Sequence, residues 1–147
     1  MSLEKKLWAD LKKATDRDVL WTRLEAWVGT GIPDLNGVVS SPTGGARDGI
    51  EFWLELKICR TKSLSLSNLW RPAQIAWQTL RSRQKDNVFN LVGHPESKTL
   101  YLFAAYRIPE ITMVKGPCAV VPCFSISGPG AHAKCVEYIV SSLRRSS

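Results

Sequence analysis

The sequence predicts an α/β fold, and three observations carry this prediction. Apolar and polar residues alternate through "GIEFWLELKI", which is typical of a β-strand. Leucines recur every four residues near the N-terminus, which is typical of a helix. Segments of the two kinds interleave in the order helix, three strands, helix, two strands, helix. With 147 residues the chain has the size of one domain, so we expect a single domain over 1–147.

The first helix is predicted over residues 2–14. Leu3, Leu7 and Leu11 form its apolar stripe, and Ser2 is placed to act as its N-cap. Polar residues at 16–18 end this pattern. The next stretch, "VLWTRLEAWV", fits either a strand or a second helix, and we favour a strand that runs into a loop.

Two further strands form the centre of the predicted fold. The stretch "GTGIPDLNGVV" predicts a strand over 32–39, and "SSPTGGARDG" predicts the hairpin loop before the next strand. One face of that next strand is apolar, whereas the other carries Glu51, Glu55 and Lys57. Burying charges costs free energy unless they are paired, neutralised or bound to an ion. The charged residues therefore indicate a functional site.

The second half of the chain predicts two helices and two strands. Pro72 fits the first turn of a helix whose expected buried stripe is Ile75, Ala76, Thr79 and Leu80. The opposite face of that helix carries Gln74, Gln78 and Arg81. The stretches "VFNLVG" and "TLYLFAAY" predict strands around the turn "HPESK". Residues 109–130 are expected to be irregular, with a short strand in "CAVVPCF", and a last helix is expected over 132–145.

The composition is that of a soluble globular protein. Hydrophobic residues make up 44% and charged residues 22%, and no apolar run approaches the roughly 18 residues that a membrane helix needs. The N-terminal residues do not resemble a signal peptide, so we expect a cytoplasmic protein. The four cysteines are expected to be reduced thiols. Zinc is the alternative, but its spacing is poor because Cys118 and Cys123 have no second close pair beside them.

The net charge of +7 predicts a polyanionic partner. Between residues 58 and 85 the sequence contains no Asp or Glu but has repeated cations: Arg60, Lys62, Arg71, Arg81, Arg83 and Lys85. Such a segment is either a solvated basic face or a clamp on a nucleic-acid backbone. The second interpretation requires that the basic face adjoins the carboxylates.

Asp34, Glu55 and Lys57 are the candidates for chemistry. If their two strands pair as a hairpin, the three side chains converge. Two carboxylates and the backbone carbonyl of Leu56 would supply the oxygen ligands that Mg²⁺ prefers. Lys57 would then orient or deprotonate an attacking water, or stabilise charge on a phosphate. The alternative is a buried ion-pair network without catalysis.

Three short motifs resemble the PD-(D/E)xK nuclease superfamily: "GIPD" at 31–34, "ELK" at 55–57 and "RPAQ" at 71–74. Within it, the chain is most similar to small VRR-NUC and Holliday-junction-resolvase-like phage endonucleases. The resemblance covers roughly residues 3–106. It implies a restriction-endonuclease-like core, in which helices flank a mixed central β-sheet. It also implies a bacterial or phage-infected host cytoplasm.

The resemblance implies roles only at matching positions. Asp34 and Glu55 would be metal ligands, Lys57 the catalytic lysine, and Gln74 a contact to metal-bound water or phosphate. An additional acidic residue is expected from the first helix or near the "GIPD" loop, and both Glu4 and Glu25 are candidates. Each also has a structural interpretation, Glu4 as an acidic first-turn residue and Glu25 as a salt-bridge partner. The expected DNA contacts are Arg23, Arg60, Lys62, Arg71 and Arg81.

The leading functional hypothesis is a Mg²⁺-dependent DNA endonuclease in which Mn²⁺ can substitute. The resemblance implies branched DNA such as a Holliday junction as substrate and a homodimer as the active form. A VRR-NUC-like nickase or flap nuclease would have the same residues. The alternatives are a basic DNA-binding protein with an inactive nuclease-like core and, least favoured, a hydrolase of small phosphate esters. The number of metal ions stays open.

Overall fold

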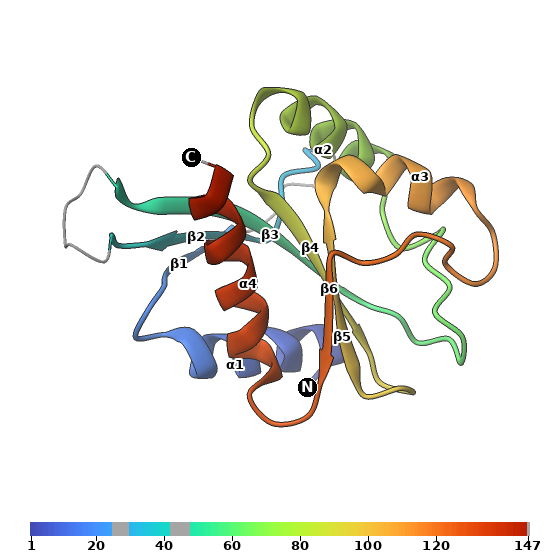
Figure 1. The fold of residues 1–147 in the computed structure, drawn as a ribbon. Helices are drawn as coiled ribbons and strands as arrows, with labels where there is room; N and C mark the ends of the chain where they lie inside the picture. The colour runs from blue at the N-terminus through green and yellow to red at the C-terminus, as the bar shows by residue number, and fades with distance from the viewer. Residues whose placement is uncertain (25–29, 42–47, 147) are drawn as a thin grey trace.

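The computed structural model describes residues 1–24, 30–41 and 48–146, which form helices around one six-stranded β-sheet (Figure 1). The strands are β1 (Leu20–Arg23), β2 (Leu35–Val39), β3 (Ile50–Ile58), β4 (Val88–His94), β5 (Thr99–Ala104) and β6 (Phe124–Ser127). The helices are α1 (Leu3–Thr15), α2 (Pro72–Gln84), the short 3₁₀ helix η2 (Ala105–Arg107), α3 (Ile108–Met113) and α4 (Ala131–Ser146).

The sheet is mixed, and its strands lie in the order in which they occur along the chain. β3 and β4 pair in parallel, and every other neighbouring pair of the sheet is antiparallel. A parallel pair needs a crossover connection, and α2 provides it. The predicted fold class, α/β with helices that flank a mixed sheet, is therefore confirmed.

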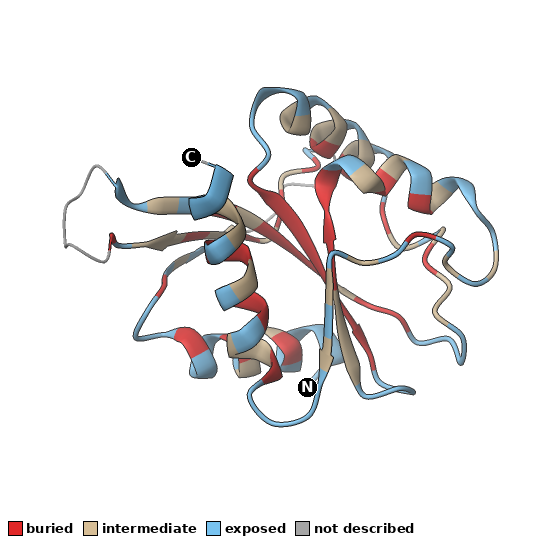
Figure 2. Ribbon diagram, viewed as in Figure 1, coloured by how far each residue is buried: buried red, intermediate tan, exposed pale blue. Residues whose placement is uncertain are grey.

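The helices cover both faces of the sheet (Figure 1). α1 and α4 lie on one face, where Leu7, Leu11 and Ile139 pack against apolar side chains of β3 such as Phe52 and Leu54. α2 and α3 lie on the other face. β4 is buried along its whole length at the centre of the sheet (Figure 2). The alternating side chains of β3 thus face two different layers. Those on one side pack in the apolar layer with α1 and α4, and those on the other side face a partly polar layer with α2.

Several predicted elements are confirmed close to their expected bounds. Ser2 caps α1, since its Oγ accepts a hydrogen bond from the Lys5 N–H at 3.2 Å. The favoured strand in "VLWTRLEAWV" is β1. In α4 the apolar residues Val136, Ile139 and Val140 are buried, as their spacing predicted. β2 begins at Leu35 rather than at residue 32, so Asp34 directly precedes the strand.

The region 109–130 is more regular than predicted. α3 starts at Ile108, and Pro109 occupies its first turn, where a missing N–H costs no helical hydrogen bond. Ile108 and Ile111 bury their side chains against the α2 side of the sheet. β6 begins at Phe124, so most of "CAVVPCF" precedes the strand that was expected within it. Two apolar residues spaced by three positions next to a proline are too few to predict a helix from the sequence.

The predicted orientation of α2 is wrong. Gln74 and Gln78 are buried, with 4% and 0% of their surface exposed, while Leu80 is 63% exposed. The reason is the sheet below, which presents Glu55, Lys57 and Asn90 to the helix. The amides on α2 satisfy these polar groups, which apolar side chains would leave without partners.

The described residues include no helix that is long and apolar enough to cross a membrane. The cysteines Cys59, Cys118, Cys123 and Cys135 are all free, as expected for reduced thiols.

Candidate active site

Antiparallel pairing of β2 with β3 brings Asp34 next to Glu55. Leu35 lies opposite Leu54, so the residue before Leu35 meets the residue after Leu54. Two hydrogen bonds fix this arrangement. The Asp34 N–H donates to Glu55 Oε1 at 3.2 Å, and the Leu56 N–H donates to Asp34 Oδ2 at 3.0 Å. Both carboxylates are thus oriented by the backbone of the neighbouring strand.

Lys57 completes the predicted triad. It lies two residues after Glu55, on the same face of β3, and its Nζ is 3.3 Å from Glu55 Oε2. The side chain of Glu55 is 3% exposed and that of Lys57 is 14% exposed. The ion pair is therefore largely shielded from water, and the ammonium is its more accessible member.

Gln74, in the first turn of α2, joins the two members of this ion pair. Its Nε2 donates to Glu55 Oε2 at 3.0 Å, and its Oε1 accepts from Lys57 Nζ at 3.0 Å. The same Oε1 accepts from the Arg71 N–H at 2.9 Å, as part of a capping box at the start of the helix. The "RPAQ" motif thus begins the helix and positions its glutamine over the carboxylate.

A second polar layer lies behind Gln74 and holds α2 on the sheet. Asn90, on β4 opposite Glu55, exchanges hydrogen bonds with the side-chain amide of Gln78 at 2.7 and 2.8 Å. Trp70 Nε1 donates to Asn90 Oδ1 at 2.9 Å. Asn90 and Gln78 are both 0% exposed. This fully bonded network fixes the helix one turn beyond Gln74.

Gly31, the first residue of "GIPD", lets the Asp34 segment approach α2. Its φ is +73°, a conformation that favours glycine. A Cβ atom at this position would lie 2.1 Å from the carbonyl oxygen of Ala73. The segment that carries Asp34 and the helix turn that carries Gln74 are therefore in direct backbone contact.

Burial raises the pKa of Glu55 to about 7, and the nearby Asp34 carboxylate adds to the effect. The Lys57 ammonium opposes both by its charge and its hydrogen bond. Near neutral pH the carboxyl therefore lies close to its titration point. A group of this kind changes its charge state readily when a cation or a phosphate arrives.

This pKa predicts a fall in stability as the pH rises from about 4.5 to about 7 when no divalent cation is present. In that range the folded chain keeps a proton that unfolded Glu55 has lost, so the free energy of unfolding falls by about 3 kcal/mol. We expect this change in urea melts in EDTA, as the difference between the native chain and Glu55→Gln. Mg²⁺ should restore part of the lost stability at pH 8. If the difference in the free energy of unfolding between the native chain and Glu55→Gln stays constant across this pH range, the raised pKa of Glu55 is contradicted.

Glu4 and Asp34 both line a pocket of about 160 Å³, which Arg23, Leu56 and Lys5 also line. Glu4 is exposed at the start of α1. In the described part of the chain, no three Asp, Glu, His or Cys side chains lie close enough together to hold a metal ion. Asp34, Glu55 and the carbonyl of Leu56 still suit a hard cation such as Mg²⁺, which needs one or two carboxylates and keeps several waters. Glu25, the competing candidate, lies outside the described residues.

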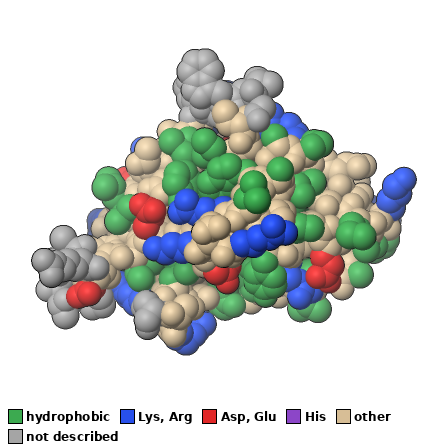
Figure 3. Space-filling model, turned by 90° about the horizontal axis from the view of Figure 1, so that it is seen from above, with side chains coloured by type: hydrophobic (Ala, Val, Ile, Leu, Met, Phe, Trp, Pro, Cys, Tyr) green, Lys and Arg blue, Asp and Glu red, His purple; other side chains and the backbone are tan. Residues whose placement is uncertain are grey.

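The predicted DNA-binding cations fall into two groups. Arg23, Arg60, Lys62 and Arg71 are exposed. Arg81 differs, since its guanidinium lies 5.9 Å from the ring centre of Trp53 and 5.8 Å from that of Trp77. Figure 3 shows Lys and Arg side chains in a broken row across the face seen from above, among hydrophobic side chains. Arg81 has a packing role that its place in the sequence did not reveal.

No role was predicted from the sequence for Gly31, Asn90 or Gln78. A signal existed for Asn90, since an amide in the apolar strand "VFNLVG" must find a partner when that strand is central. The role of Gly31 depends on a contact with a helix about forty residues away, which no local pattern records.

The chain matches no family model, and no curated protein matches it.

Proposed function

We propose that this protein is a Mg²⁺-dependent DNA endonuclease that hydrolyses phosphodiester bonds. The observation that carries the proposal is the convergence of Asp34, Glu55 and Lys57, from two paired strands, under Gln74 of the following helix. The resemblance to PD-(D/E)xK nucleases assigns catalysis to the same residues. A buried ion pair of this kind is costly to retain for stability alone.

Asp34 and Glu55 would hold the cation, with Leu56 contributing its carbonyl oxygen. When bound, the cation supplies Lewis-acid activation of water and offsets charge on the phosphate. Glu55 must be ionised for this, and its pKa of about 7 makes cation affinity rise with pH through neutrality. Glu4, which lines the same pocket as Asp34, would approach the cation through that pocket.

Lys57 would act on the substrate directly. An ammonium has three N–H donors, and the contacts to Glu55 and Gln74 use two of them. The third is left for the attacking water or for a phosphate oxygen on which charge builds up. Gln74 keeps the ammonium in place, because its amide oxygen accepts from both Lys57 and the helix backbone.

The substrate class follows the same resemblance and the net charge of +7. Branched DNA is the substrate that we place first, with a homodimer to cut two strands in the cytoplasm of a bacterium or of a phage-infected host. The exposed cations Arg23, Arg60, Lys62 and Arg71 would contact the phosphate backbone.

The alternative is a DNA-binding protein that no longer cuts. One observation favours it: both oxygens of Glu55 already accept hydrogen bonds from the protein, Oε1 from Asp34 and Oε2 from Gln74 and Lys57. A carboxylate saturated in this way resembles a closed ion-pair network. This alternative predicts that DNA affinity is unaffected by EDTA.

A cleavage assay on labelled DNA tests the proposal. Four-way junction, flap, single-stranded and linear duplex DNA are incubated with Mg²⁺, Mn²⁺ or EDTA. We expect metal-dependent nicking by the native chain and its loss in Glu55→Gln. Glu51→Gln is the matched control, because Glu51 lies on the same face of β3 but is exposed and outside the site. If the native chain binds DNA but cuts none of these substrates with either cation, the DNA-binding alternative replaces the endonuclease.

A further inference from the structure

A groove between α1 and β1 continues outward from the candidate active site. Its volume is about 940 Å³, and its lining includes Trp8, Lys12, Trp21 and Arg23. Trp8 and Arg23 also line the small pocket beside Asp34. The two hollows are therefore neighbours that share a wall, and a chain-like ligand bound at Asp34 can extend into the groove.

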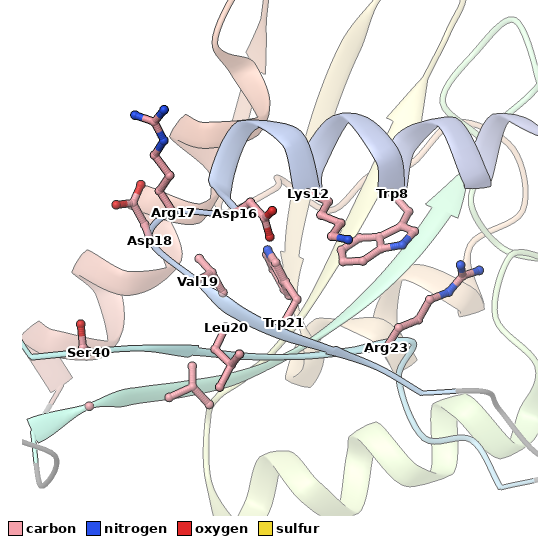
Figure 4. Close-up of a pocket in the computed structure, with 12 residues that line it drawn as sticks. Trp8, Lys12, Asp16, Arg17, Asp18, Val19, Leu20, Trp21, Arg23 and Ser40 are labelled. Atoms are coloured by element: carbon pink, nitrogen blue, oxygen red, sulfur yellow. The ribbon is translucent and has the colours of Figure 1, made fainter.

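The end of the groove nearest Asp34 is basic, as is the adjoining small pocket, to which Lys5 contributes. Lys5, Trp8 and Lys12 are spaced by three and four residues, which places them on one side of α1. Figure 4 shows Trp8 and Lys12 pointing from α1 toward β1, and Arg23 pointing from β1 toward Trp8. Lys5, Lys12 and Arg23 form no salt bridge with any described residue. These cations are thus available to an anionic ligand.

The groove also offers aromatic surface. The indoles of Trp8 and Trp21 meet edge to face, with ring centres 5.8 Å apart, and both are only partly buried. Trp21 Nε1 donates to Thr15 Oγ1 at 2.9 Å, which holds this ring in place. At the far end the lining has mixed charge, with Asp16, Arg17 and Asp18. The basic and aromatic stretch is therefore short and lies next to the active site.

We propose that this groove binds a short single-stranded segment of DNA next to the scissile phosphate. Alternating cations and aromatic rings suit single strands, because unpaired bases stack on the rings while the phosphates meet the cations. In a duplex the base faces are already covered by neighbouring bases. This inference deepens the proposed endonuclease function and rests on it for the placement of the scissile phosphate, but the binding itself requires no cleavage.

Binding measured without cleavage tests the groove. The probe is a fluorescent ten-nucleotide oligo(dT), followed by anisotropy in EDTA, with a ten-base-pair duplex as comparison. Lys12→Ala should weaken oligo(dT) binding about fivefold at 0.1 M salt and lower the slope of log affinity against log salt by about 0.7. Trp8→Leu should weaken it about tenfold and leave that slope unchanged, since stacking releases no counterions.

Lys13→Ala is the matched control, because Lys13 is the neighbouring exposed lysine of α1 and does not line the groove. Circular-dichroism melts exclude loss of fold in each variant. Equal effects of Lys12→Ala and Lys13→Ala, or tighter binding of the duplex than of oligo(dT), would overturn the inference. If Lys12→Ala and Trp8→Leu weaken oligo(dT) binding as described but the native chain cuts no DNA, the inference is supported and the endonuclease proposal is overturned. If the native chain cuts DNA and the two substitutions change neither cleavage nor oligo(dT) binding, the endonuclease proposal is supported and the inference is overturned.

Discussion

Replacement of Lys57 by alanine is expected to lower the rate of DNA cleavage by about 10²- to 10³-fold, which is the usual effect of removing one donor that stabilises a transition state. DNA affinity should change little, because Lys57 is only 14% exposed and is held by Glu55 and Gln74. Single-turnover cleavage of a labelled junction, together with anisotropy binding, measures the two effects separately. Lys115→Ala is the control, since it removes an exposed lysine from the loop after α3, for which no DNA contact is proposed.

The pH dependence distinguishes two roles of Lys57. Its charge lowers the pKa of Glu55, so its loss should raise that pKa further and weaken Mg²⁺ binding at neutral pH. At a pH well above this raised pKa Glu55 is ionised again, and the affinity for Mg²⁺ should recover. If cleavage recovers as well, Lys57 only tunes the carboxylate. If cleavage stays low, Lys57 acts on the reacting groups, as we propose.

Gly31→Ala is expected to be the most destabilising substitution near the site. The new Cβ would lie 2.1 Å from the Ala73 carbonyl oxygen, and the residue would also keep a φ of +73°. Neither backbone can move without separating Asp34 from α2. We expect the free energy of unfolding to fall by about 3 kcal/mol, at the upper end of the usual cost of strain. Chemical denaturation with urea measures this change.

Gly116→Ala provides the matched control. Gly116 has a similar positive φ of +86°, but no heavy atom lies within 4 Å of its Cβ position. It should therefore lose only the conformational part, about 1 kcal/mol. Equal losses of stability in Gly31→Ala and Gly116→Ala would show that the contact with Ala73 is unimportant.

Cleavage by the folded fraction of Gly31→Ala should fall by about 10²-fold, because a shift of about 1 Å misaligns the reacting groups.

The paired strands and the triad were predictable because they depend on local patterns. Strict alternation in β3 set the face of Glu55 and Lys57, and the glycine- and proline-rich loops marked the hairpin that brings Asp34 to them. The motif "RPAQ" predicted the start of α2 for the same reason, since proline fits the first turn of a helix. These signals act over a few residues, and tertiary packing does not contradict them.

The orientation of α2 could not be read in this way. Its apolar residues suggested one buried face, but Leu80 is exposed and Gln78 is fully buried. What decides the face is the polar surface of β3 and β4, where Glu55, Lys57 and Asn90 require hydrogen-bond partners. A hydrophobic pattern reflects how favourably each side chain leaves water. At the interface between α2 and the sheet, side chains are buried because they form hydrogen bonds.

By itself, the sequence determined the α/β class, the strand that carries the charges and the three residues of the triad. The tertiary structure alone decided that Gln74 bridges Glu55 and Lys57, that Gly31 touches Ala73, and that the groove of Trp8 and Lys12 adjoins Asp34. The physical reason is the distance along the chain over which each kind of interaction acts. Periodicity and turn chemistry act between near neighbours in the chain, whereas these contacts join segments whose distance is set by the packing of helices on the sheet.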